Sequence, residues 1–571
     1  MESNASITRT TPGEQTCRPY LALCAVVLGI WVLAVFTTTR TTLWDRDESR
    51  YGTSALEMAA SGHFLYPTFN GELRAHQPVM VYWLMAAPVM MLGPTEYAVR
   101  FPSTVAFAAI CLMTGLIACE LGGRRCCWLA ALLVGTSPMA FMAGTAATTD
   151  ALLAAFILLS QWIFVRAWTR GPRVWHGPAM GLAIGCALLT KGPLGLILPV
   201  LTITGALILA RGRSAAGPFW RMLLTSSLMG AGIFLAWGIP ANAATGGAYW
   251  QIAIVERLPR RVFTAMEGHG GGDPVSYFLH LPYYLLVLVV AILPWTMYLP
   301  AARRALQHVP RYGVWGRSPS GLVALLAGMV VPPLILMTLL VSKLPHYALP
   351  VVPWMAVLLA LGLNAASLPD FPIAERDRFR RIAISFVFVY ILIAAAVGLA
   401  PWVLPVLAPW KSAGVLLALL AFAVLGGVTY FLARNDFLAA VRIHALGMVA
   451  GVVACGLLVL PSLENLVKPG QILARELGRG TDGDGSVACL GWTEPGMHFY
   501  LGGRTITYLA DDGAFENWAL KKGPATLIST RGDADRIKES LESKGFRKIA
   551  QSAGLDHVRG GWVVLCAFRR D

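Results

Sequence analysis

The apolar stretch VMVYWLMAAPVMML, residues 79–92, decides how the rest of this chain is arranged. At about 1.5 Å per residue, a helix of this length falls well short of the ~30 Å hydrocarbon core of a bilayer. Longer apolar runs follow it along most of the sequence. Whether residues 79–92 cross the membrane therefore decides the side on which every later loop lies.

The composition is that of a membrane protein. Apolar residues make up 56% of the chain and charged residues 13%, whereas soluble domains carry about 25% charged residues. Backbone groups in lipid must be paired within the segment, so the runs are expected to be helices. The runs expected to cross are 20–38, 98–121, 126–146, 149–167, 177–190, 192–210, 222–241, 277–300, 320–341, 346–366, 381–401, 413–433 and 440–461. The sequence predicts a polytopic α-helical membrane protein.

Basic residues between the runs determine the topology, because cytoplasmic loops are enriched in lysine and arginine. If residues 79–92 do not cross, the basic clusters all fall on the cytoplasmic side with the N-terminus. These clusters are Arg124–Arg125; Arg166, Arg170 and Arg173; Arg211, Arg213 and Arg221; Arg303, Arg304, Arg311 and Arg317; Arg376, Arg378, Arg380 and Arg381; and Arg434. If they cross, nearly all of these clusters move outside. We therefore expect a re-entrant or interfacial helix at 79–92 and thirteen spans in all.

This topology places several polar segments on the extracytoplasmic side. They are 38–97, Thr148–Asp150, Lys191, 242–276, 342–347 and the sequence from about 465 onward. The last of these has strand-like runs (SVACLGW, TITYLA, ATLIST, WVVLCAF) and an amphipathic pattern around Ala534–Lys544. We expect a membrane domain at 1–464, with extracytoplasmic loops 38–97 and 242–276, followed by a soluble α/β domain at 465–571.

Charge and cysteine content exclude other classes of protein. The net charge of +15 comes from short clusters between spans, which is a topogenic pattern and argues against a nucleic-acid partner. The ten cysteines show no CxxC spacing, and only Cys489 and Cys566 share a strand-rich segment where a disulfide would be compatible. The first run lacks an A-x-A-like cleavage site, so we expect it to remain as an anchor.

The first extracytoplasmic loop carries the sharpest candidate site, in WDRDESRYG, residues 44–52. Asp47 and Glu48 are candidate catalytic carboxylates, since group transfer needs a group that accepts a proton from, or orients, an attacking hydroxyl. Arg50 and Tyr51 suit a substrate surface, because arginine forms paired bonds to phosphate oxygens. The alternative is a pair of solvated acids near a helix N-terminus.

Two further charged residues fall on the same side at span ends. Asp150 opens the fourth span and is a third candidate catalytic acid, although an acid there is equally consistent with a helix cap. Lys191 interrupts two apolar runs in LLTKGPLGLILP and must either reach the interface or bind an anion.

Later loops contain further candidate residues for substrate and metal binding. In ERLPRRVFTAMEGHGGGDP, Arg260, Arg261 and His269 would face a polyanionic substrate from a glycine-rich lid, or the segment is a flexible surface loop. His76 and His269 would jointly hold a divalent metal such as zinc. SKLPHYALP places Lys343, His346 and Tyr347 at the outer edge of a span. Neither a Walker A loop nor a dinucleotide-binding GxGxxG is present, which favours an activated lipid phosphate over a bound nucleotide.

These blocks resemble a known family. DESRYGTSALEMAASGHFLYPTFNGELRAHQPVMVYWL, LLTKGPLGLILP, EGHGG, SKLPHYALPVVP and EPGMHFYLGGR are similar, in matching order, to the bacterial polyprenyl-phosphate-sugar-dependent membrane glycosyltransferases of the GT-C fold. The lipid A aminoarabinose transferases and the protein mannosyltransferase relatives are the nearest groups. The resemblance implies catalytic acids at Asp47, with Glu48 beside it, and Asp150. It implies donor-phosphate contacts at Arg50, Lys191, Arg261 and Lys343, and places His269 in a partly mobile loop.

The resemblance has one departure. Aminoarabinose transferases show Glu-Lys-Pro where this chain has His76-Gln77-Pro78, and glutamine cannot supply the lysine's charge to a phosphate. Either another cation takes the place of that lysine, or the donor and acceptor differ from those of the aminoarabinose transferases.

The expected function is transfer of a sugar, such as 4-amino-4-deoxy-L-arabinose, from undecaprenyl phosphate to an extracytoplasmic acceptor, foremost lipid A. The enzyme is expected in the bacterial inner membrane, with its site and C-terminal domain in the periplasm. The alternatives are the same chemistry on a protein or another glycan, a transporter or lipid flippase, and an inactive scaffold. Charged groups at span ends and the lack of an internal repeat argue against the transporter.

Overall fold

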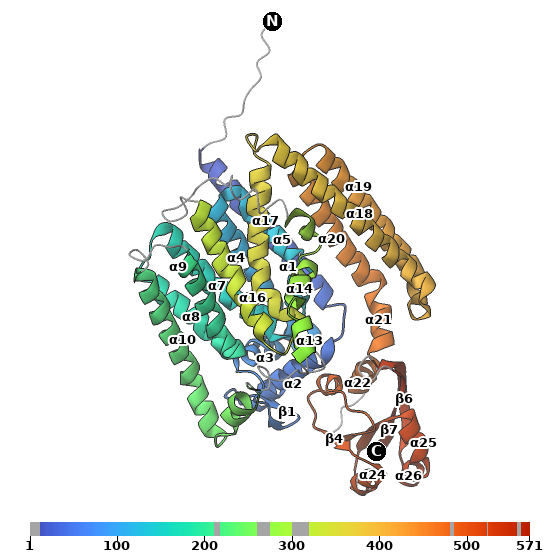
Figure 1. Ribbon diagram of the computed structural model, residues 1–571. Helices are drawn as coiled ribbons and strands as arrows, with labels where there is room; N and C mark the ends of the chain where they lie inside the picture. The colour runs from blue at the N-terminus through green and yellow to red at the C-terminus, as the bar shows by residue number, and fades with distance from the viewer. Residues whose placement is uncertain are drawn as a thin grey trace.

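The chain is a long helical bundle with a small sheet-containing unit at one end (Figure 1). The computed structural model describes residues 12–209, 217–257, 259, 274–299, 319–479, 485–521, 523–556 and 561–570. The bundle comprises α1 (Pro12–Thr38), α4 (Glu96–Gly122), α5 (Arg124–Gly135), α6 (Pro138–Thr145), α7 (Thr149–Arg170), α8 (His176–Lys191), α9 (Leu194–Leu209), α10 (Gly217–Ala244), α13 (Pro274–Leu279), α14 (Tyr283–Ala291), α16 (Pro319–Leu339), α17 (Val352–Ala366), α18 (Ile373–Val403), α19 (Lys411–Ala433) and α20 (Phe437–Leu458).

The predicted spans all correspond to helices, but not all are long. Within the described residues, nine helices are long and apolar enough to cross a membrane, or ten if α5 and α6, bent by 68°, form one span. The three remaining predicted spans are represented by α8 and α9, of 16 residues each, and by the short helices α13 and α14. The polytopic helical class is confirmed, whereas the predicted count of thirteen full-length spans exceeds what these lengths support.

The first long loop folds across the end of the bundle. It contains α2 (Asp45–Ser61), a hairpin of β1 (Thr68–Phe69) and β2 (Glu72–Leu73), and α3 (Met80–Leu92). The hairpin turns at Asn70 and Gly71, whose positive φ angles of 57° and 80° suit a tight two-residue turn. Helix α3 has 13 residues, about 20 Å at 1.5 Å per residue, which agrees with a segment that does not span the bilayer alone.

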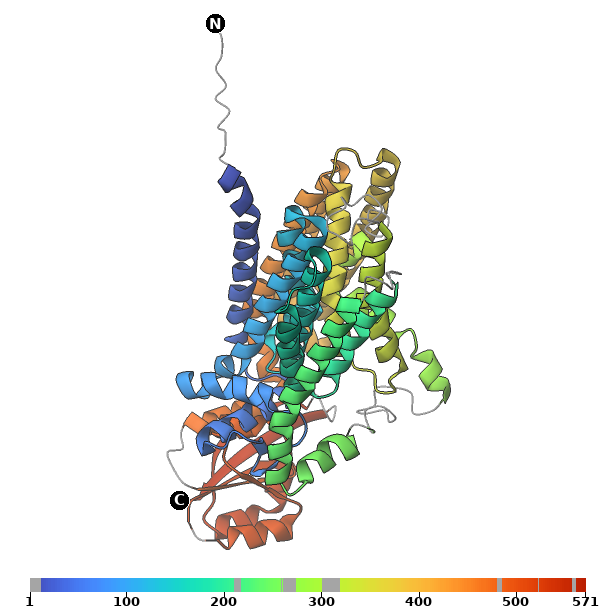
Figure 2. The same cartoon turned by 90° about the vertical axis from the view of Figure 1, so that its left-hand side faces the viewer.

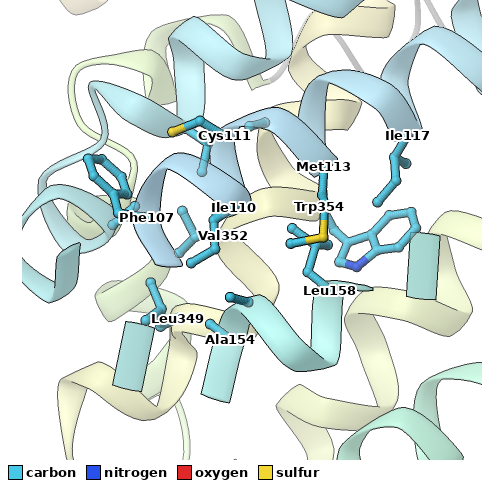
Figure 3. Packing of buried hydrophobic residues seen from close by; sticks show 14 of the residues in the cluster. Phe107, Ile110, Cys111, Met113, Ile117, Ala154, Leu158, Leu349, Val352 and Trp354 are labelled. Atoms are coloured by element: carbon cyan, nitrogen blue, oxygen red, sulfur yellow. The ribbon is translucent and has the colours of Figure 1, made fainter. Parts of the chain in front are cut away.

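The bundle core lies where α4, α7 and α17 meet (Figure 3). Trp354 of α17 is fully buried there, and its indole N–H donates to the Gln161 side chain of α7 at 2.8 Å. Gln161 in turn donates to Thr202 of α9 at 3.1 Å, so these three buried polar side chains satisfy one another. At Gly328 of α16, a Cβ would lie 2.2 Å from the backbone nitrogen of Ala206, so glycine permits the close approach of α16 to α9.

The C-terminal unit is a mixed five-stranded sheet with helices on both faces. Its strands are β3 (Ser486–Leu490), β4 (Ile506–Leu509), β5 (Ala525–Thr530), β6 (Arg547–Asp556) and β7 (Gly561–Arg570), in the order β4-β3-β5-β7-β6. The first three run parallel, and β7 is antiparallel to β5 and β6. One face packs on α22 (Pro469–Arg479) and α23 (Gly496–Tyr500), and the other on α24 (Asp512–Ala519) and α26 (Lys538–Ser543).

Three details of this unit differ from the sequence analysis. The four predicted strands are present, but β6 was not predicted because its side chains are mostly exposed and polar. The predicted helix around 534–544 is two short helices, α25 (Arg531–Arg536) and α26, which meet at Ile537. Cys489 and Cys566 are both buried free thiols, on strands separated by β5.

The polar segments predicted to share one side are gathered at one end of the bundle. In Figures 1 and 2 the start of α1 lies at the opposite end from the C-terminal sheet, and α2, α3 and β1 lie between that sheet and the bundle. Direct bonds join these parts. The Leu43 N–H donates to the Tyr500 hydroxyl at 2.6 Å, and the Asn70 side chain exchanges two hydrogen bonds with the backbone of Ile506.

Candidate functional site

Glu48 is the centre of a buried ionic network rather than an exposed acid. Its side chain and that of Arg100 of α4 are each 2% exposed, and the guanidinium donates from Nε at 2.9 Å and from Nη2 at 2.7 Å to its carboxylate. Arg100 also donates to the carbonyl oxygens of Thr38, Thr41 and Thr42. The backbone N–H groups of Trp44 and Ala147 donate to Glu48 as well. These bonds fix the first loop and the 147–150 turn against each other.

Asp47 occupies the neighbouring helical position and faces outward. One residue rotates a side chain by about 100° around an α-helix, so the bonds that bury Glu48 turn Asp47 toward solvent. Its side chain is 56% exposed, and its Oδ1 atom lies 3.6 Å from Nη1 of Arg50, on the next turn of α2. Of the two adjacent acids, Asp47 is thus the exposed one.

Asp150 and Lys191 form an ion pair where α7 begins and α8 ends. The Lys191 ammonium donates to Asp150 Oδ1, and the Thr148 hydroxyl donates to Oδ2 at 3.3 Å. The Lys191 Nζ also lies 5.7 Å from the centroid of the Tyr347 ring. Asp150, Lys191, His346 and Tyr347 line one small cavity, the two aromatic residues coming from η4 (Pro345–Val351). The structure therefore brings four of the predicted site residues together.

Tyr51 lies one helical turn after Asp47 on α2. It is buried, and its ring centroid is 5.8 Å from that of Tyr82 of α3. Burial chiefly, and then Tyr82, Asp47 and Asp150, raise the pKa of Tyr51 well above its usual range. At neutral pH Tyr51 is consequently a neutral phenol, able to donate a hydrogen bond but not to act as a base.

Lys343 is engaged elsewhere. It is 1% exposed, and its ammonium donates to the carbonyl oxygens of Thr338 at 2.5 Å and Leu340 at 2.7 Å. Those carbonyls end α16, where a cation complements the helix dipole. The Nζ atom also lies 5.3 Å from the Tyr277 ring centroid. The structure gives Lys343 a capping position, and a phosphate contact would require these bonds to open.

The histidine and lid hypotheses fall largely on positions that the structure leaves undescribed. Arg260, Arg261 and His269 lie outside the described residues. His76 is described and exposed. Among the described residues, no three histidine, cysteine, aspartate or glutamate side chains gather as a metal site would require. The zinc hypothesis therefore remains a prediction.

Two residues of this region were missed by the sequence reasoning. Arg100 has a clear signal, because an ionisable residue within an apolar run usually has a buried partner. Arg74 is the first residue of RAHQP, two positions before the candidate His76, and it is 6% exposed. Its packing against Tyr51, Phe69 and Tyr82 could not be read from the sequence.

Known proteins resemble this chain over most of its length. Residues 17–242 match the family described as dolichyl-phosphate-mannose-protein mannosyltransferase. The undecaprenyl phosphate-alpha-4-amino-4-deoxy-L-arabinose arabinosyl transferase 2 of Proteus mirabilis is 26% identical over 423 residues, which is 71% of this chain and 71% of that protein. The corresponding transferase of Edwardsiella ictaluri is 29% identical over 323 residues, 56% of this chain and 55% of that protein. The second alignment thus spans about half of that relative.

Two solved structures share the fold. The crystal structure of ArnT from Cupriavidus metallidurans bound to undecaprenyl phosphate superposes with a TM-score of 0.76 at 17% identity, covering 96% of this chain and 98% of that one. The same protein in the apo state gives a TM-score of 0.72 at 18% identity, covering 96% and 97%. At these identities the likeness establishes the fold, and it includes the C-terminal sheet because nearly all of both chains is covered.

Proposed function

We propose that this chain is a GT-C membrane glycosyltransferase that uses a polyprenyl-phosphate sugar and modifies a lipid acceptor of the bacterial envelope, a reading that its relatives and its fold support. The sugar we propose is 4-amino-4-deoxy-L-arabinose, the donor its undecaprenyl phosphate ester, and the acceptor lipid A. The observation that carries the proposal is the set of acids and cations at one end of the bundle: Asp47 with Arg50, and Asp150 with Lys191.

The reaction is a substitution at the anomeric carbon. An acceptor oxygen forms a bond to that carbon while the bond from carbon to the phosphate oxygen breaks, and undecaprenyl phosphate leaves. Asp47 is the proposed base or orienting group, since its carboxylate is exposed and loosely held. If the acceptor oxygen belongs to a phosphate of lipid A, it needs no deprotonation, and Asp47 then positions it.

The proposed cations stabilise the charge that develops on the departing phosphate. Arg50 is half-buried beside Asp47, and Lys191 lies in the cavity with Asp150, His346 and Tyr347. The phenol of Tyr51, kept neutral by burial, would donate a hydrogen bond. We further propose that this end of the bundle faces the periplasm and that the enzyme resides in the inner membrane, as the distribution of basic residues in the sequence predicts.

Mass spectrometry of lipid A tests this function. A host without its own aminoarabinose transferase, supplied with the donor, would express the wild-type chain, Asp47→Asn, or Asp512→Asn as a matched control. Asp512 forms an exposed ion pair with Arg536 on the C-terminal unit, so its substitution is expected to leave transfer intact. We expect one aminoarabinose increment on lipid A with the wild type and the control, and none with Asp47→Asn.

Other outcomes of the experiment are equally informative. An Asp47-dependent sugar on a different envelope component would retain the reaction and reject lipid A as acceptor. No Asp47-dependent change on any component, with folded protein and donor present, would reject the glycosyltransferase and favour a transporter or scaffold.

A further inference from the structure

Arg74 is held in an aromatic enclosure next to the candidate site. It follows β2 and precedes α3, and its backbone N–H donates to the Pro67 carbonyl at 3.0 Å. Its guanidinium carbon lies 5.4 Å from the ring centroid of Tyr51 and 5.7 Å from that of Phe69. Its Nε donates to the Tyr82 hydroxyl at 3.2 Å. Three elements of the first loop, namely α2, β1 and α3, thus surround this one cation.

The enclosure provides no carboxylate partner. Among the described residues no aspartate or glutamate forms an ion pair with Arg74, and Asp47, which acts on it electrostatically, has its contact with Arg50. The neighbouring Tyr51 stays neutral because burial raises its pKa. Cation–π contacts offset only part of the cost of taking a charge out of water. Among the residues that the structure describes, the buried guanidinium therefore has no carboxylate as an ion-pair partner.

The other candidate cations that the structure describes each contact a protein acceptor. Arg50 faces Asp47 at 3.6 Å, Lys191 is paired with Asp150, and Lys343 is bonded to two carbonyl oxygens. Gln77, three residues after Arg74, has an uncharged side chain, and its backbone carbonyl accepts from the Tyr249 hydroxyl at 2.8 Å. Among these described cations, Arg74 is the one whose guanidinium bonds to neither a carboxylate nor a carbonyl oxygen, so a phosphate bound there would displace no such partner.

We propose that Arg74 binds the phosphate group of a lipid substrate, with the aromatic enclosure holding its guanidinium toward the acids. The proposal rests on the glycosyltransferase function proposed above. A planar guanidinium presents parallel N–H donors that match two phosphate oxygens. Tyr51, which Arg74 packs against, lies one helical turn after Asp47 on α2, so the bound phosphate would lie near that acid. Both the donor and lipid A carry phosphates, and the test separates them.

Binding to the purified, full-length protein in detergent distinguishes these cases. Thermal stabilisation would be titrated with undecaprenyl phosphate, with undecaprenol as the phosphate-free control, and with lipid A. The variants are Arg74→Gln, Arg74→Lys and, as a matched control, Arg536→Gln, which removes an exposed arginine of the C-terminal unit. Donor KM and kcat would be measured on the same preparations.

We expect Arg74→Gln to bind undecaprenyl phosphate at least about tenfold more weakly, with a raised donor KM and unchanged binding of undecaprenol. Arg74→Lys should retain part of the affinity, because it keeps the charge without the paired geometry. If lipid A alone binds more weakly, the phosphate site belongs to the acceptor. Undiminished binding of both lipids by a folded Arg74→Gln protein would overturn the proposal.

Two further outcomes keep the test decisive. If Arg74→Gln does not fold, then Arg74→Lys with wild-type affinity for both lipids and an unchanged donor KM would overturn the paired-donor site. If the wild type binds no undecaprenyl phosphate and transfers no sugar, the proposed function itself fails. If the wild type binds and transfers while Arg74→Gln does so equally well, only the role of Arg74 fails.

Discussion

Two groups of charges meet at the first loop of this protein, and they are built in opposite ways. Around Glu48 and Arg100 of α4, both side chains are 2% exposed and almost every polar atom has a protein partner. Around Asp47, one residue before Glu48, the side chain is 56% exposed, and its ion-pair contact among the described residues is Arg50 at 3.6 Å. The first group is complete without a ligand, whereas the second leaves its donors and acceptors available.

The buried Glu48–Arg100 group is also connected to the C-terminal unit. Lys468 donates to Glu464, to the Thr42 hydroxyl and to the Thr42 carbonyl, the same carbonyl that Arg100 contacts. Its Nζ lies 4.1 Å from the centroid of the Trp44 ring. The buried network of Glu48, Arg100 and Lys468 therefore anchors the first loop. It holds the backbone at Asp47 in place while the Asp47 side chain stays exposed.

The largest expected difference comes from substituting the two adjacent acids separately. Glu48→Gln leaves the buried charge of Arg100 uncompensated, and we expect a loss of about 3–5 kcal/mol of stability. Thermal unfolding in detergent measures it. Asp47→Asn is the matched control and should unfold like the wild type while glycosyl transfer falls by about 10²–10⁴-fold. Equal destabilisation by the two variants would contradict the distinction between a supporting and a reacting acid.

A smaller effect is expected at the Asp150–Lys191 pair. Its side chains are 16% and 6% exposed and line a cavity, so removal of one partner should cost about 1–3 kcal/mol. A double-mutant cycle with Asp150→Asn, Lys191→Met and their combination would measure the coupling. We expect the double variant to lose less stability than the sum of the single ones, because neither charge is left unpaired. Strict additivity would show that the pair is not coupled.

A gradual effect is expected at alkaline pH. Burial, opposed by Glu464, lowers the pKa of Lys468 from its ordinary value of 10.5 to about 8. Between these values the unfolded chain binds more protons than the folded one, so this lysine makes stability rise with pH by about 1.4 kcal/mol per unit. Lys468→Met should remove that rise in thermal unfolding between pH 8 and 10.5. Lys544→Met, at a more exposed pair with Glu516, should keep it; equal slopes in all three proteins would refute the assignment.

The sequence predicted the positions of the helices more accurately than their lengths. Runs of apolar residues predicted every described span, because lipid forces backbone groups to pair within a segment. Hydropathy did not predict that α5 and α6 are bent by 68° at their junction, since this depends on packing. In the C-terminal unit, buried strands such as β3 and β5 were found from their apolar pattern, whereas β6 lacks that pattern because it forms the sheet edge.

The residues of the candidate site also include some that the sequence predicted and some that only the structure revealed. Asp47, Asp150 and Lys191 were found because charges at span ends, all on one predicted side, are conspicuous in an apolar sequence. Sequence alone could not tell Asp47 from Glu48, because the two differ only in which one meets Arg100, 52 residues away. The guanidinium of Arg74 was not recognised for the same reason, since its partners Tyr51, Phe69 and Tyr82 come from three separate elements.

By itself, the sequence determined that this protein spans a membrane many times and which end of the bundle carries the polar loops. It also determined that residues from about 465 onward contain strands. These properties follow from local hydropathy and charge, which each segment carries with it. Only the tertiary structure decided which acid is buried, which cation has no carboxylate partner among the described residues, and how the C-terminal unit is bonded to the first loop. Those outcomes depend on partners far apart in the chain, and burial makes the presence or absence of each partner costly.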